Sequence, residues 1–268
     1  MGQSLRSIVR TPSALRSGLL TGLAQIVLAF AAAGAGALLA QKFGRSAETD
    51  GFLAAYGVYL VLVLAAQAFR MVVVPDLTRA DAEGRLAGES RAYAVAFLTL
   101  AVPVSVVVAV FSGPLGDLIT GSLPPTSAHV AARALAVLVP AAFLQLLAAL
   151  AASALAALGS YGTAAGGFAL GGIVGLVVFA ALADRHGIVS LAWGLAANAV
   201  VALAIQVAAL NRRGALAGAW PARLDVRPRL WKSLLSMKAT RLSTPKVEPI
   251  MKASQVEPSC TSPSLSTA

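Results

Sequence analysis

The sequence predicts an all-α integral membrane protein in which six transmembrane helices form one bundle. Of its 268 residues, 58% are hydrophobic and only 12% are charged, whereas soluble domains carry roughly 25% charged residues. Mean hydropathy is +0.80. At 1.5 Å per residue, six apolar stretches are each long enough to cross a hydrocarbon core about 30 Å thick. These stretches lie at residues 19–40, 51–74, 92–111, 131–158, 163–183 and 188–210.

The positive charge lies at the two ends of the chain. Residues 1–17 carry three arginines and no acidic residue, residues 212–268 carry ten basic and three acidic residues, and residues 18–211 carry eight of each. Positive flanks are retained on the cytoplasmic side of a membrane, so an even number of spans places both termini in the cytoplasm. No basic stripe with interleaved aromatic residues is present, which argues against a nucleic-acid partner.

This distribution divides the chain into four parts. We expect a basic cytoplasmic N-terminus at residues 1–17, the six-span domain at 18–211 and a basic juxtamembrane segment at 212–231. Residues 232–268 are rich in Ser, Thr, Pro and Lys and have no sustained apolar period, which predicts a disordered tail. The abrupt change in composition suggests the hypothesis that the sequence is a fragment of a longer transporter or has an out-of-frame ending.

Small residues recur at helical spacing in two spans. Ala29, Ala33 and Ala37 follow one another every four residues in the first span, and Gly167, Gly171 and Gly175 do so in the fifth. Because small side chains let helices approach closely in lipid, both stretches are predicted to lie at helix–helix contacts.

The second span carries a predicted polar face. Tyr56, Tyr59, Gln67 and Arg70 fall within roughly 80° of one another on a helical wheel. We expect Asp50 to cap this helix at its start and Pro75 to end it. The connections after it are predicted to be a charged loop at residues 75–91, an irregular Gly- and Pro-rich connector at 112–128 and a turn at 184–187.

Several motifs in this order resemble a known family. FGRSAETDGFLAAY at residues 43–56 resembles the FG-x-x-x-x-TD-x-FF-x-AF stretch after the first span of the MviN/MurJ lipid II flippases, members of the multidrug/oligosaccharidyl-lipid/polysaccharide exporter superfamily. VVPDL at residues 73–77 resembles the end of their second span. Residues 157–176 and 187–210 are similar to their fifth and sixth spans. The resemblance covers roughly residues 15–225.

The resemblance implies one lobe of a transporter that moves a lipid-linked peptidoglycan or polysaccharide precursor across the bacterial cytoplasmic membrane. A cationic cavity would accept the diphosphate head group while the polyprenyl tail stays among membrane lipids. The family commonly has fourteen spans in two lobes, so a second lobe or a partner membrane protein is implied as well. Two departures stand out: the family's basic residues in the first span and at positions corresponding to residues 61–64 are apolar here.

Five polar residues inside the spans are candidates for binding the substrate. The guanidinium of Arg70 offers paired donors that match pyrophosphate oxygens, although a position about one turn from the interface also allows it to snorkel to lipid phosphates. The other four are amides, each of which can equally form a hydrogen bond between helices: Gln67, Gln25, Gln145 and Asn198. Gln206 is interpreted in the same structural way, and Tyr56 and Tyr59 as members of an aromatic belt.

No signature of an enzyme or of a cofactor site occurs. A glycine-rich phosphate loop, a nucleophile elbow and paired intramembrane carboxylates are all missing from the sequence. His129 and His186 are far apart, and Cys260 is the only cysteine, so no metal site is expected. Three alternatives stay open: a transport-inactive homologue acting as a scaffold for envelope assembly, an exporter of a small cationic drug and, least favoured, an integral-membrane transferase.

Overall fold

A computed structural model describes residues 12–216, and this part of the chain folds into helices joined by short connections. The helices are α1 Pro12–Lys42, α2 Ala47–Ala82, α3 Leu86–Val110, α4 Ser112–Thr120, α5 Pro125–Ala157, α6 Tyr161–His186, the 3-10 turn η1 Gly187–Val189 and α7 Ser190–Arg212. Five stretches are long and apolar enough to cross a membrane, and the last of them, Tyr161–Arg212, contains both α6 and α7. The chain reverses between these two helices at Gly187, whose φ is +60°. Six membrane-length helices result, which confirms the predicted fold class.

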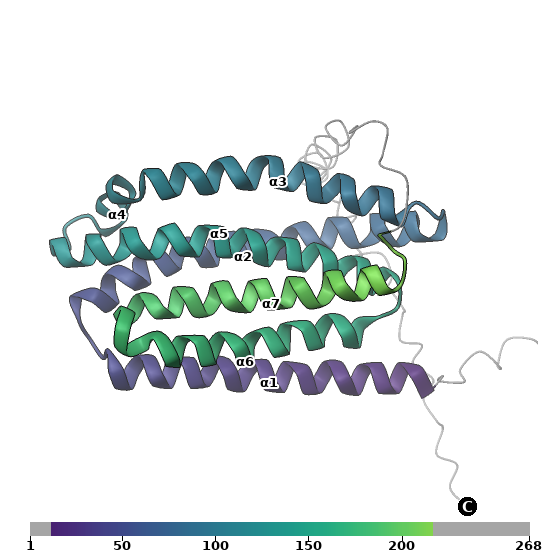
Figure 1. The fold of residues 1–268 in the computed structure, drawn as a ribbon, viewed down its shortest axis with the longest axis horizontal. Helices are drawn as coiled ribbons and strands as arrows, with labels where there is room; N and C mark the ends of the chain where they lie inside the picture. The colour runs from purple at the N-terminus through teal and green to yellow at the C-terminus, as the bar shows by residue number, and fades with distance from the viewer. Residues whose placement is uncertain (1–11, 217–268) are drawn as a thin grey trace, which may run out of the picture. The chain divides into compact units, whose positions relative to one another are not determined.

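Successive long helices run in opposite directions (Figure 1). One end of the bundle, here called the proximal end, holds the connections at residues 83–85 and 158–160 together with the start of α1 and the end of α7. The distal end holds the connections at residues 43–46 and 121–124 and the turn η1. The start of the first span and the end of the last therefore lie at the same end, as an even number of spans requires.

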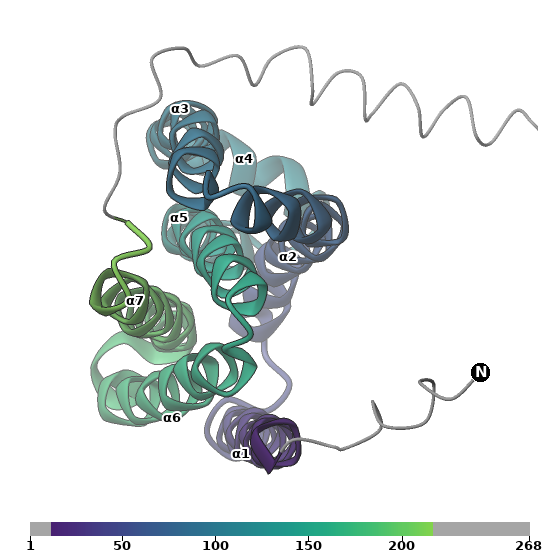
Figure 2. The ribbon, with the colours of Figure 1, turned by 90° about the vertical axis from the view of Figure 1, so that its right-hand side faces the viewer.

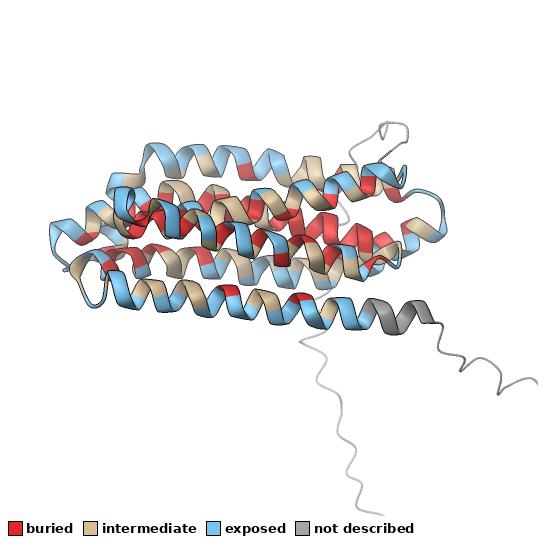
Figure 3. Cartoon of the chain, turned by 60° about the horizontal axis from the view of Figure 1, so that its bottom comes forward, coloured by how far each residue is buried: buried red, intermediate tan, exposed pale blue. Residues whose placement is uncertain are grey.

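Helix α5 lies at the centre of the bundle. It packs against α2, α3 and α4 on one side and α7 on the other, while α1 packs on α6 (Figure 2). In the most apolar part of α5, 67% of the residues are buried, compared with 6% in α1. Figure 3 shows the buried residues gathered in the interior and α1 largely exposed. In a bilayer, the exposed apolar side chains of α1 would face lipid.

The second helix is longer than predicted. Pro75 lies inside α2, which continues to Ala82, so the expected loop at residues 75–91 is wrong and only residues 83–85 connect α2 to α3. The proline removes one backbone donor. The continuing helix buries Val73, Leu77 and Ala80 on one face, and this burial outweighs the loss of a single hydrogen bond.

The connector at residues 112–128 is also more regular than predicted. Residues 112–120 form α4, in which Pro114 occupies the first turn, where its missing N–H has no helical partner to lose. Gly116 lets α4 approach α5 closely, because a Cβ at this position would lie 2.6 Å from the carbonyl oxygen of Ala128. Only residues 121–124 remain outside a helix.

Two acidic residues differ from prediction: Asp50 does not cap α2, and Asp184 does not lie in a turn. Ser46, not Asp50, caps α2: its hydroxyl accepts a hydrogen bond from the backbone N–H of Thr49 at 3.2 Å. Asp184 belongs to α6 rather than to a turn, and it forms an ion pair of 2.6 Å with Lys42 at the distal end. This ion pair links the last turn of α1 to the last turn of α6.

The ends of the chain lie outside the described residues. Helix α1 begins at Pro12, within the segment 1–17 that was expected to precede the membrane domain. Most of the predicted juxtamembrane segment and the whole of the predicted tail at residues 232–268 fall beyond residue 216. Their boundaries stay predictions.

Candidate functional site

The glycine ridge of α6 forms the seam with α7. A Cβ on Gly175 would lie 2.6 Å from the carbonyl oxygen of Gly194, and one on Gly171 would lie 2.5 Å from Oδ1 of Asn198. Gly167 faces the side chain of Gln206 in the same way. The prediction that this ridge allows close helix packing is confirmed.

Two amides of α7 point into this seam. Gln206 is fully buried, and its Nε2 donates to the carbonyl oxygen of Ala164 at 3.3 Å. Its predicted role as a hydrogen-bonding link between helices is therefore confirmed. Oδ1 of Asn198 and Oε1 of Gln206 are buried and have no hydrogen-bond partner within residues 12–216. The side chain of Asn198 thus packs against Gly171, and its Oδ1 accepts no hydrogen bond within the described residues.

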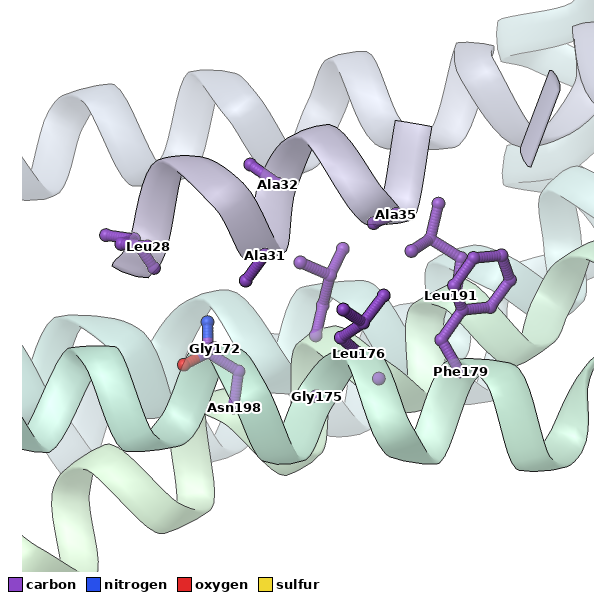
Figure 4. Close-up of a pocket in the computed structure, with 12 residues that line it drawn as sticks. Leu28, Ala31, Ala32, Ala35, Gly172, Gly175, Leu176, Phe179, Leu191 and Asn198 are labelled. Atoms are coloured by element: carbon purple, nitrogen blue, oxygen red, sulfur yellow. The ribbon is translucent and has the colours of Figure 1, made fainter. Parts of the chain in front are cut away.

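A cavity of about 200 Å³ lies beside this seam, between α1, α6 and α7 (Figure 4). Its walls are almost entirely apolar because alanine and glycine residues line half of it, and leucine and phenylalanine side chains line most of the rest. Asn198 is the one polar side chain among its lining residues. The cavity therefore has the character of a hydrocarbon-filled space and lacks the cations that a diphosphate needs.

The second cluster of candidates lies between α2 and α5, which run side by side in the same direction. The register is fixed at their distal ends, where the hydroxyl of Ser127 donates to the carbonyl oxygen of Ala47 at 2.6 Å. Gly51 is pressed against the backbone of Ser127 there, since a Cβ would lie 2.2 Å from its carbonyl oxygen. Gln145 lies 18 residues beyond Ser127, and the residues 18 beyond Ala47 and Gly51 are 65 and 69. Gln145 is therefore at the same depth as Gln67 and Arg70.

Arg70 and Gln145 have complementary polar atoms at this depth. Nε of Arg70 is a buried donor and Oε1 of Gln145 a buried acceptor, and neither has a hydrogen-bond partner within the described part of the chain. Gln67, one turn before Arg70, is exposed. A buried polar group without a partner costs roughly 1–3 kcal/mol, so both atoms favour a polar ligand or water at this position.

Aromatic side chains border this cluster on the side of α3. Phe69 packs edge-on against Tyr93, and Phe97 packs against Phe143 in the same manner. The hydroxyl of Tyr93 also donates to Oδ2 of Asp76 at 3.0 Å. These contacts hold α3 against α2 and α5 at the depth of Arg70.

The predicted polar face of α2 does not exist as one surface. Tyr59 is buried in the apolar core, and Tyr56 stacks between it and Phe52, so an aromatic belt is the wrong interpretation for Tyr59. Gln67 is exposed while Arg70 is half-buried. A helical wheel cannot predict these differences, because they depend on how far the neighbouring helices cover each position of α2.

The five candidate residues are thus divided among three places. Arg70, Gln67 and Gln145 share one depth on α2 and α5, Asn198 lies in the α6–α7 seam, and Gln25 is exposed on α1. The hydrogen bond between Tyr93 and Asp76 was not predicted from the sequence. The acidic residue directly after Pro75 in VVPDL was the available signal. Within residues 12–216, no three His, Cys, Asp or Glu residues are grouped to hold a metal.

Comparison with known protein families gives a match. The family model described as "Lipid II flippase MurJ" matches residues 39–245, which is more than half of the chain. The matched region begins in the last turns of α1 and includes α2 to α7. No curated protein matches the chain.

Proposed function

This chain belongs to the lipid II flippase MurJ family, and from that premise we propose how its residues take part in transport. The family makes it a membrane transporter of a lipid-linked saccharide precursor used in peptidoglycan biosynthesis, located in the bacterial cytoplasmic membrane. Members of the family move their substrate and catalyse no chemical reaction. The six membrane-length helices of the described region suit this role.

We infer that the α2/α5 cluster contacts the head group of the precursor. The observation that carries this proposal is the buried, unpartnered Nε of Arg70 at the depth of the unpartnered Oε1 of Gln145. A guanidinium can donate two parallel hydrogen bonds to a phosphate, and the amide of Gln145 can accept from a sugar hydroxyl or amide. Gln67 is exposed one turn away from Arg70, and it would bind an outer part of the head group.

Two features of the whole transporter are proposals as well. The arginines that precede the first span and follow the last span favour a cytoplasmic location for the proximal end of the bundle. Alternating access also needs a second wall facing this bundle, which a further lobe or a partner membrane protein would supply.

Replacement of Arg70 tests the head-group site. We expect Arg70→Ala to weaken lipid II binding by the purified chain about tenfold to a hundredfold, because a hydrogen bond to a charged group contributes roughly 1.5–3 kcal/mol. Arg70→Lys should give an intermediate loss, since it keeps the charge and loses the planar fork. Binding can be measured by titration of lipid II in detergent.

Arg79→Ala is the matched control, because Arg79 lies on the same helix nine residues on and is exposed. It should bind lipid II as the unmodified chain does. Equal affinities for Arg70→Ala and Arg79→Ala would return Arg70 to the role of an interfacial anchor. In cells, depletion of the protein should lower the lipid II accessible from outside; an unchanged level would favour the scaffold alternative.

A further inference from the structure

A hollow with two arginines at its rim lies at the proximal end of the bundle, apart from the α2/α5 cluster. Its volume is about 340 Å³, and residues near the start of α6 and the end of α7 line it. We call it the α6–α7 hollow; its lining residues are Thr163, Ile205, Ala208, Ala209, Arg212 and Arg213. Because α2 and α7 pack on α5 from different sides, this hollow is separate from the proposed head-group site.

The residues that line the hollow carry two positive charges and no negative one. Arg212 and Arg213 are consecutive, and no carboxylate is among the lining residues. Two acidic side chains at the proximal end, Glu83 and Glu89, are engaged by Arg85, and their hydrogen bonds and charges raise the pKa of Arg85. Two adjacent guanidiniums with no carboxylate among the residues that line the hollow favour a bound anion, and phosphate suits their paired donors.

The hollow is also amphipathic along the bundle axis. Arg212 and Arg213 lie at the last turn of α7, while Ile205 lies seven residues deeper, or about 10 Å along the helix. Ala208 and Ala209 are small, so they leave an apolar floor between the two levels. Thr163 adds a hydroxyl from the first turn of α6. A free phosphate would use only the charged rim, whereas a phospholipid would place its phosphate at the rim and its first chain segments on the floor.

We propose that the α6–α7 hollow binds an anionic membrane phospholipid, with the phosphate on Arg212 and Arg213 and the upper acyl chain over Ile205, Ala208 and Ala209. The bound lipid is a component of the surrounding membrane and is distinct from the transported precursor. It covers the charged end of the seam that joins α6 to α7, so it stabilises the packing of these two helices. This binding requires residence in a membrane and does not depend on which precursor is transported.

Titration of the purified full chain in a neutral detergent tests the proposal, with phosphatidylglycerol and phosphatidylcholine as the two probes. Binding is followed by native mass spectrometry and by the midpoint of thermal unfolding. We expect phosphatidylglycerol to bind more tightly than phosphatidylcholine and to raise the midpoint. The double variant Arg212→Gln/Arg213→Gln should bind phosphatidylglycerol about tenfold to thirtyfold more weakly, since each arginine contributes about a factor of five at an anionic lipid surface.

Two control pairs separate the hollow from general charge and volume effects. Arg79→Gln/Arg185→Gln removes the same charge elsewhere and should leave phosphatidylglycerol binding unchanged. Ala208→Leu fills the floor and should weaken binding several-fold, whereas Ala204→Leu adds the same volume to α7 outside the lining residues and should not. Equal losses within either pair would overturn the proposal.

Two further probes identify the source of the phosphate. Inorganic phosphate at millimolar concentration should neither displace phosphatidylglycerol nor raise the unfolding midpoint, and equal protection by it would reduce the hollow to a free-anion site. Undecaprenyl diphosphate should not bind more tightly than phosphatidylglycerol in the Arg70→Ala variant. A clear preference for the diphosphate there would assign the hollow to the substrate and overturn the proposal, while leaving the proposed transport function intact.

Discussion

The contact between Gly175 and Gly194 gives the sharpest quantitative prediction for this fold. A Cβ added at Gly175 would lie 2.6 Å from the carbonyl oxygen of Gly194 and 3.1 Å from Cβ of Asn198. The nearest atom belongs to the backbone, so no rotamer change can relieve the contact and α6 must move away from α7. Forced overpacking of this kind costs typically 1–3 kcal/mol. For a region of this size the unfolding midpoint of Gly175→Ala should fall by about 2–10 °C.

Gly166→Ala provides the matched control for this change. Gly166 lies on the same helix, and a Cβ there would meet nothing within 4 Å. Its replacement should be neutral, or stabilising by up to about 1 kcal/mol, because alanine favours helix more than glycine does. Thermal unfolding in detergent, followed by intrinsic tryptophan fluorescence, compares the two variants under identical conditions.

A double-mutant cycle then tests whether the clash is shared. A Cβ on Gly194 would lie 2.6 Å from the carbonyl oxygen of Gly175, so either substitution separates the same two backbones. Once α6 and α7 have moved apart, the second alanine should cost less than it does alone, and the combined loss should be smaller than the sum. Additive losses, or a Gly175→Ala variant as stable as Gly166→Ala, would refute the close-packed seam.

Two smaller predictions concern the distal end. Ser46→Ala should destabilise the bundle by about 0.5–2 kcal/mol, because it removes the hydroxyl that accepts a hydrogen bond from Thr49 and caps α2. The control Ser122→Ala, in the exposed connector, should have little effect on the unfolding midpoint. Equal unfolding midpoints for the two variants would contradict the cap. Lys42→Ala and Asp184→Ala should each lower the stability of the bundle by less than about 1 kcal/mol at low salt, because their ion pair is exposed. The difference from the unmodified chain should vanish at about 1 M salt. A loss of stability that persists at high salt would mean that these residues stabilise the bundle by packing and not by their charges.

Hydropathy was sufficient to predict the six membrane-length helices, and the glycine spacing predicted the α6 seam. The alanine repeat of the first span was wrongly predicted to lie at a helix contact, because Ala29, Ala33 and Ala37 are exposed on α1. Lipid imposes strong length and composition limits on spanning segments, and the four-residue glycine repeat marks one face without reference to its partner. The ends of the helices depend on different information. Pro75 and Pro114 both looked like breaks, yet one lies inside α2 and the other in the first turn of α4. Which outcome applies depends on the tertiary burial of the residues that follow.

Prediction of the candidate site would have required knowing which neighbouring helices cover each polar residue, and a sequence pattern does not contain this information. A helical wheel placed Tyr59 and Arg70 on one face, but α5 buries the first and leaves the second half-buried with an unpaired donor. Gln25 and Gln67 had the same apparent status as Gln145, and only Gln145 has a buried, unused acceptor. Such differences arise from the register between α2 and α5, which a single contact near Ser127 sets.

That register explains why one helix pair can be both the most tightly joined and the best suited to bind a head group. At the distal end, Gly51 admits the backbone of Ser127 and leaves no space between α2 and α5. Farther along, the contact passes from small residues to the long side chains of Arg70 and Gln145, whose polar atoms find no protein partner within the described helices. In lipid, unused polar groups of this kind are costly to keep, and a head group or water that paired with them would offset this cost, as the proposed binding site requires.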